Sequence, residues 1–133
     1  MAWGLAWVGQ VDEAVAIADK VATMAPGHMH TKLALRVKDG LYRDVAGARA
    51  ELTPEFHEWC FRECIWSYHQ AAAFALAGGA DDALRWLEHA VDLGWINYPL
   101  LAEKDPFLAN IRGDERFKKL MERVKKEWDE FEV

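Results

Sequence analysis

Hydrophobic residues recur along most of the chain with the spacing of an amphipathic helix, at positions i, i+3, i+4 and i+7. Residues 80–93 give the clearest example, in which one face carries Ala83, Leu84, Leu87, Ala90 and Val91. Asp81 and Asp82 stand in the first turn, where negative charge suits the helix dipole, and Gly94 follows as the expected C-terminal cap. No segment alternates with the period of a strand, so the pattern predicts an all-α fold.

Prolines and glycines separate the helical segments from one another. The main breaks are Pro26-Gly27, Asp39-Gly40 and Gly78-Gly79, and Thr53-Pro54 is typical of an N-cap followed by proline at the first helical position. The last segment has an apolar stripe made of Phe117, Leu120, Met121, Val124, Trp128 and Phe131. Together these signals predict helices over residues 1–8, 11–25, 29–38, 42–52, 55–77, 80–93, 105–111 and 114–131.

Size and charge limit the classes of protein to which the chain can belong. Its 133 residues suit one compact domain, and its net charge of −6 argues against a nucleic-acid binder or docking on anionic membranes. No apolar run is long enough to cross a bilayer, and the N-terminus lacks the features of a signal peptide. We therefore expect a cytoplasmic protein with neither nucleic acid nor membrane as a partner.

Two short segments resemble each other. Gly9-Gln-Val-Asp-Glu-Ala14 and Gly78-Gly-Ala-Asp-Asp-Ala83 each place a glycine, two variable residues, two acids and an alanine in the same order. They lie about two periods of roughly 34 residues apart, which is the spacing of the tetratricopeptide (TPR) repeat. Phe74 and Ala71 fit the aromatic and small positions of the helix before Gly78. The chain thus resembles the TPR family, with a degenerate middle repeat that turns at Asp39-Gly40.

The tail extends this resemblance. The segments 95–101, 105–108 and 112–117 look like the closing region of bacterial TPR proteins in which repeats follow a kinase, cyclase or DNA-binding regulatory domain. The resemblance implies one α-solenoid domain over residues 1–133, built of antiparallel helix pairs. Its repeats would span about 1–26, 28–53 and 55–94, and residues 95–133 would form a tail and a C-terminal capping helix. The first helix is short at Met1, so the chain is either a piece excised from a longer protein or one with a natural start there.

Residues with metal-binding or catalytic chemistry are few. His57, Cys60 and Cys64 would share one face of a helix over 55–77, but a structural zinc site needs a fourth ligand, which only another helix could supply. We expect the two cysteines to behave as small buried hydrophobes. No phosphate loop, nucleophile elbow or HExxH motif is present. The sequence therefore predicts no enzyme activity, no bound metal and no cofactor.

Seven tryptophans are the unusual feature of the composition. In the register of the TPR resemblance, Trp3 and Trp7 fall on the side of the first helix that lines the concave groove of such arrays. The corresponding groove positions on later helices are His30, Ala34, Lys38, Tyr68, Ala72 and Leu76. Tryptophan and tyrosine are frequent interface anchors, so these eight residues form the predicted partner-binding groove. The alternative is that the aromatic side chains simply pack between neighbouring helices.

Two functions follow from this interpretation. The first is a protein–protein interaction module within a larger bacterial regulatory or signalling protein, which binds a protein or peptide in its concave groove. The second is a structural domain that forms a homodimer through its exposed first helices.

Overall fold

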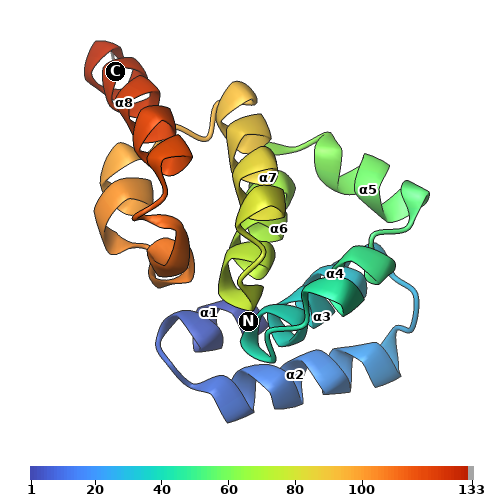
Figure 1. The fold of residues 1–133 in the computed structure, drawn as a ribbon. Coiled ribbons are helices and arrows are strands. Elements are labelled where there is room, and N and C mark those ends of the chain that lie inside the picture. The colour runs from blue at the N-terminus through green and yellow to red at the C-terminus, as the bar shows by residue number, and fades with distance from the viewer. Residues whose placement is uncertain (132–133) are drawn as a thin grey trace.

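Helices make up most of the chain in the computed structural model, which describes residues 1–131 and contains no strand in that range. The elements are α1 (Ala2–Trp7), α2 (Val11–Met24), α3 (Met29–Leu41), α4 (Val45–Glu51), α5 (Pro54–Phe61), α6 (Cys64–Ala77), α7 (Ala80–Asp92), the π-helical turn η1 (Leu100–Lys104), the 3₁₀ helix η2 (Pro106–Ile111) and α8 (Glu115–Glu130). Figure 1 shows α6 and α7 at the centre, α1 to α4 below them, α5 on one side, and η1, η2 and α8 on the other. The predicted all-α class is confirmed.

Small residues set the spacing of the first three helices. Gly9 has a positive φ of 81°, a conformation that glycine adopts without strain, and it reverses the chain between α1 and α2. The face of α2 that packs inward carries Ala14 and Ala18, both fully buried. Because neither side chain extends beyond Cβ, α2 can lie close against α1 and α3.

Gly40 differs from its predicted role. The sequence suggested that Asp39-Gly40 ends a helix at residue 38, but α3 runs through both residues to Leu41. A Cβ at position 40 would lie 2.9 Å from the Cβ of Leu76, so this glycine permits close contact between α3 and α6. The chain turns at Tyr42–Asp44 instead, where Arg43 has a φ of 59° and Asp44 caps α4 by accepting from the Gly47 amide.

The predicted helix over 55–77 is wrong, because the structure divides it into α5 and α6. Thr53 accepts from the Phe56 amide at 3.3 Å, which confirms the expected N-cap of α5. Glu63 then has an extended backbone (φ −128°, ψ 134°) that breaks the helix. The Ser67 hydroxyl donates to the Cys60 carbonyl at 2.9 Å and so satisfies an acceptor near the end of α5. This hydrogen bond forms only when α5 and α6 meet at an angle, and local hydrophobic periodicity does not encode that angle.

Within residues 1–131, α6 and α7 form the most extensive contact between two helices. α6 has buried residues on nearly all of its sides, and the apolar stripe of α7 packs against it. Ala83, Leu87 and Ala90 are fully buried, as their pattern predicted. Gly78, with a φ of 92°, caps α6 in the left-handed conformation, which makes the tight turn between the two helices.

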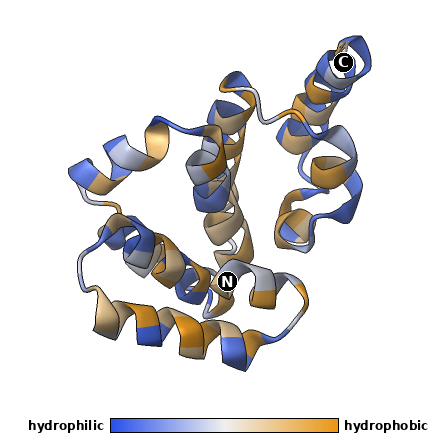
Figure 2. Ribbon diagram, turned by 180° about the vertical axis from the view of Figure 1, so that it is seen from behind, coloured by the Kyte–Doolittle hydropathy of each residue, from blue (hydrophilic) through white to orange (hydrophobic). Residues whose placement is uncertain are grey.

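The C-terminal part follows the predicted pattern except at the end of the apolar stripe, where Trp128 and Phe131 are both exposed. Helix α8 begins one residue after the predicted start, and Phe117, Leu120, Met121 and Val124 are buried in the main core. Trp128, a member of the predicted apolar stripe, is 41% exposed because it lies one turn beyond the residues that α8 packs against the rest of the molecule. Figure 2 shows the alternation of hydrophobic and hydrophilic residues along α8 and α2.

A buried arginine joins three helices. Arg36 on α3 is 1% exposed. Its Nε donates to Oε1 of Gln70 on α6 at 2.7 Å. Its Nη1 donates to Oδ2 of Asp39 on the same helix and to the carbonyl of Ala48 on α4. Its guanidinium also lies 5.0 Å from the ring centre of Phe74. Desolvation lowers the pKa of Arg36, although the group stays charged at neutral pH. The junction of α3, α4 and α6 therefore rests on a charged centre as well as on apolar packing.

Candidate functional site

The eight predicted groove residues lie on three helices. Trp3 and Trp7 belong to α1, the residues from His30 to Lys38 to α3, and those from Tyr68 to Leu76 to α6. Since α3 contacts both α1 and α6, the structure places them on neighbouring elements. The eight predicted groove residues nevertheless fall into two groups, one in an open cavity and one covered by other parts of the chain.

The open part is a cavity with a volume of about 340 Å³. Trp3, His30 and Ala34 from the predicted set line it, together with two residues of α6, Trp66 and His69. Ile17 and Val21 of α2, Leu33 of α3, and Met1 and Ala2 complete the walls. We call this cavity, which has no acidic side chain among its lining residues, the aromatic groove.

Ring contacts hold the walls of the aromatic groove in place. The Trp3 indole nitrogen donates to the Leu33 carbonyl at 3.0 Å, and its ring lies edge-on to His69 with centroids 4.9 Å apart. His30 lies edge-on to Trp66 at 5.5 Å, and Trp66 stacks on Trp59 of α5 at 5.0 Å. Such arrangements fix ring orientation, so the groove is largely preformed.

The charge state of the aromatic groove follows from burial. Desolvation lowers the pKa of His69, while its Nδ1 lies 2.7 Å from the Ile65 carbonyl. His69 is therefore neutral at pH 7, with Nδ1–H donating to that carbonyl. The groove presents hydrophobic and aromatic surface with few polar atoms, which suits an apolar side chain better than an ion.

The covered part of the predicted groove lies under the tail, residues 95–111. The Tyr68 hydroxyl donates to Oδ2 of Asp105 at 2.5 Å, and the Tyr68 ring stacks on Trp95 at 5.1 Å. Phe107 lies edge-on to both Trp3 and Trp7, at 5.4 Å from each. The expectation that these positions share one open surface is therefore wrong, because the tail folds back on them.

Three other predicted groove residues also serve internal contacts. Ala72 is fully buried, and Leu76 packs against Gly40 of α3. Lys38 donates to Oδ1 of Asp19 on α2 at 2.6 Å, an interaction that raises the pKa of the lysine. These positions stabilise the helix stack and contribute nothing to the aromatic groove.

Sequence reasoning missed Trp66 and His69. The predicted groove register on this helix used Tyr68, Ala72 and Leu76, and Trp66 and His69 lie outside that register. Trp66 and His69 are three residues apart and so lie on one face of α6, which was the signal available in the sequence.

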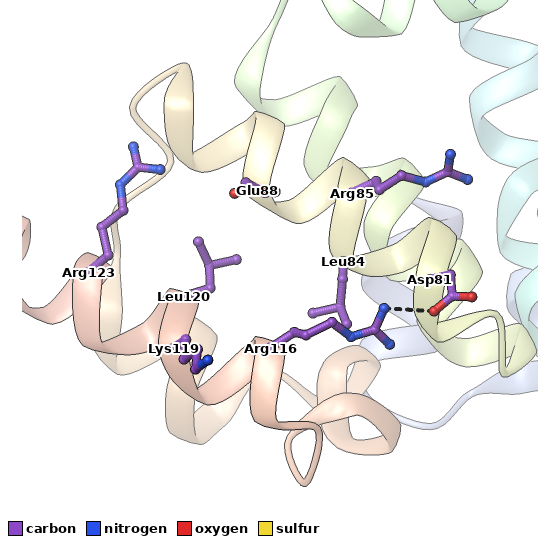
Figure 3. Close-up of a pocket in the computed structure, with 8 residues that line it drawn as sticks. All are labelled: Asp81, Leu84, Arg85, Glu88, Arg116, Lys119, Leu120 and Arg123. Atoms are coloured by element: carbon purple, nitrogen blue, oxygen red, sulfur yellow. Dashed lines mark hydrogen bonds and ion pairs between the residues drawn. The ribbon is translucent and has the colours of Figure 1, made fainter.

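A second cavity separates α7 from α8 (Figure 3) and has a volume of about 380 Å³. Leu84 and Leu120 lie within it, and two ion pairs close its ends: Arg116 with Asp81, and Arg123 with Asp92, each at 2.7 Å. Figure 3 shows the Arg85 side chain extending away from α8. We call this cavity the α7–α8 cleft.

The cysteine and histidine cluster considered from the sequence does not assemble. His57 contacts the rings of Phe61 and Trp86, whereas the Cys60 thiol is buried and accepts from Nε2 of Gln70 at 3.3 Å. Burial raises the pKa of Cys60 to about 12, so this thiol is not a nucleophile at neutral pH. Among residues 1–131, no three His, Cys, Asp or Glu side chains come close enough together to hold a metal ion.

Comparisons with known proteins assign no family. No family model matches the chain, and neither a curated protein nor a solved structure matches it. In the described part of the chain, no helix has the length and apolar character needed to span a membrane.

Proposed function

We propose that this protein is a protein-interaction module of the TPR kind, and that it binds a peptide segment whose large apolar or aromatic side chain enters the aromatic groove. The observation that carries the proposal is the groove itself: a preformed cavity of about 340 Å³ with ring walls and no acidic lining residue. Aromatic walls offer a large contact area for little loss of entropy, which favours an apolar anchor from a partner.

The order of helix contacts supports the TPR part of this proposal. The pairs α1–α2, α3–α4 and α6–α7 follow one another along the chain, and α1, α3 and α6 contact in succession. A stack of helix pairs would produce this order, because each first helix packs on the first helix of the next pair. Helix α5 stands outside the scheme as an insertion before the last pair. We also propose that the module belongs to a larger bacterial regulatory or signalling protein, as the resemblance of the tail implies.

The homodimer alternative is less well supported. It requires apolar surface on the first helix, yet Trp3 and Trp7 are half-buried and contact Phe107 of the same chain. Met1 and Val8 remain exposed there. Sedimentation across a range of protein concentrations separates the two functions, since only the alternative requires a dimer in the absence of a peptide.

The test is selection of binders from a random peptide library displayed on phage. We expect the selected peptides to share a tryptophan, phenylalanine or leucine, and to shift the NMR signals of the Trp66 indole and of His69. Ala34→Trp, which fills the aromatic groove, should abolish their binding.

The control is Phe131→Ala, which removes an exposed aromatic ring that is not among the residues lining the groove and should leave binding unchanged. Trp3 is a poor test residue because its indole also holds α3 through the Leu33 carbonyl. Peptides that bind Ala34→Trp as well as the wild type, or whose NMR shifts map elsewhere, would exclude the aromatic groove as the interaction site.

A further inference from the structure

A third cavity, on the opposite side of α7 from α8, combines aromatic walls with paired arginines. It has a volume of about 380 Å³ and lies between α4, α5 and α7, with Phe74 of α6 among its lining residues. Its guanidinium and carboxylate groups come from Arg49 of α4, and from Asp82 and Arg85 of α7. We call it the arginine pocket.

A buried carboxylate pairs with two exposed guanidinium groups. The side chain of Asp82 is only 9% exposed, and its Oδ2 accepts from Nε and Nη2 of Arg49 at 2.9 and 2.6 Å. Its Oδ1 accepts from Nη2 of Arg85 at 2.5 Å. One anion thus aligns two cations from different helices, and the pocket keeps one net positive charge.

The arginines have further donors to offer. Within residues 1–131, no hydrogen bond involves Nη1 of Arg49, or Nε and Nη1 of Arg85. A guanidinium has five N–H groups, so each arginine can bind a second acceptor while it holds Asp82. The pocket lining contains no other carboxylate that could accept from them.

Rings form the other wall of the arginine pocket. His57 lies 4.9 Å from Trp86 and 5.4 Å from Phe61, measured between ring centroids. His89 stacks on Phe61, and its Nε2 donates to the Phe61 carbonyl at 2.8 Å. This hydrogen bond joins α7 to the end of α5, the two helices that carry the rings of the pocket.

We propose that the arginine pocket binds a small organic anion with an aromatic body, in the chemical class of the aryl carboxylates. The carboxylate accepts from the free donors of Arg49 and Arg85, and the ring packs against Phe61 and His57. An inorganic anion would leave the ring wall unused. A cationic ligand would meet two guanidinium groups and only one carboxylate, although aromatic walls alone can bind cations.

Calorimetry and NMR with three related compounds test this inference on the full chain. Phenylacetate has both the ring and the charge, phenylacetamide keeps the ring without the charge, and acetate keeps the charge without the ring. We expect saturable binding of phenylacetate that shifts the Trp86 indole signal. Phenylacetamide, which lacks the charge that the arginines bind, and acetate, which lacks the ring, should each bind roughly tenfold more weakly or worse.

Two variants place the binding in this pocket. Arg49→Gln removes one cation but leaves Asp82 paired with Arg85, and it should weaken phenylacetate binding about tenfold while the thermal unfolding curve confirms folding. Arg123→Gln, an arginine on α8 outside the pocket, should bind phenylacetate like the wild type. Failure of phenylacetate to bind the wild type would overturn the proposal. So would equal binding of phenylacetamide, or undiminished binding by folded Arg49→Gln.

Discussion

Helix α7 has a different kind of contact on each of its two sides. Toward α6 it packs through fully buried small and branched side chains, among them Ala83, Leu87 and Ala90. Toward α8 it lines the α7–α8 cleft, in which Leu84 of α7 and Leu120 of α8 form part of the wall, and ion pairs link Asp81 with Arg116 and Asp92 with Arg123. The first contact depends on shape and volume, whereas the second depends partly on exposed charges. The same helix should therefore respond to different perturbations on its two sides.

The largest effect should come from removing volume on the α6 side. Leu87→Ala leaves a cavity at a fully buried position and should lower the free energy of unfolding by about 2–5 kcal/mol, measured by urea denaturation. The control is Leu93→Ala, because Leu93 is 42% exposed and should change stability little. Similar losses for both variants would show that α7 is not closely packed on α6.

Adding volume on the same side should have the next largest effect. Ala83→Leu places three further carbon atoms where no space is left, and overpacking typically costs about 1–3 kcal/mol. The melting temperature should fall clearly, whereas Ala46→Leu, at an exposed position of α4, should leave it almost unchanged. An unaltered melting curve for Ala83→Leu would contradict the close α6–α7 contact.

The tail contact with α6 should be sensitive to pH. Burial raises the pKa of Asp105, partly offset by the hydrogen bond from Tyr68, so folding favours the protonated acid. The contribution of this group to stability is fully present below the unfolded-state pKa, and it is lost as the pH rises through the higher folded-state pKa.

Asp105→Asn removes this titration and can keep the acceptor for the Phe107 amide. Urea denaturation of both proteins between about pH 3 and 7 measures how the titration of Asp105 changes the free energy of unfolding. The wild type should gain stability relative to the variant as the pH falls. A constant difference across this range would mean that Asp105 has the same pKa in both states.

The smallest effect should come from the charged side of α7. A double-mutant cycle with Asp92→Asn and Arg123→Gln should give a coupling of about 0.2–1 kcal/mol, because both side chains are substantially exposed. In about 1 M salt the coupling should nearly vanish, since the Debye length is then about 3 Å. Leu87→Ala should lower the free energy of unfolding equally at low and high salt. A coupling between Asp92 and Arg123 that did not change with salt would contradict the distinction between the two sides of α7.

Local sequence features predicted α7 and most of α8 because their hydrophobic stripes and caps lie within the helices themselves. The break between α5 and α6 could not be predicted in this way, since it depends on Ser67 bonding back to Cys60. Gly40 shows the same limit, because a glycine that ends a helix and one that admits a neighbouring helix look alike in sequence.

The candidate site was predicted only in part. Of the eight predicted groove residues, Trp3, His30 and Ala34 line the aromatic groove. The cover over Tyr68 could not be foreseen, because the hydrogen bond from Tyr68 to Asp105 joins residues that are 37 positions apart. The arginine pocket likewise depends on Arg49 and Asp82, which are 33 positions apart. Long-range pairs of this kind leave no periodic signal.

The buried guanidinium of Arg36 has a consequence for cooperativity. Its acceptors come from three helices, including the Ala48 carbonyl of α4, which has only one buried residue of its own. If α4 opened alone, the charged group would lose an acceptor while α3 and α6 still held it away from water. Local opening of this short helix is therefore coupled to the opening of its neighbours, and the backbone amides of α4 should exchange their hydrogens far more slowly than its length and exposure suggest.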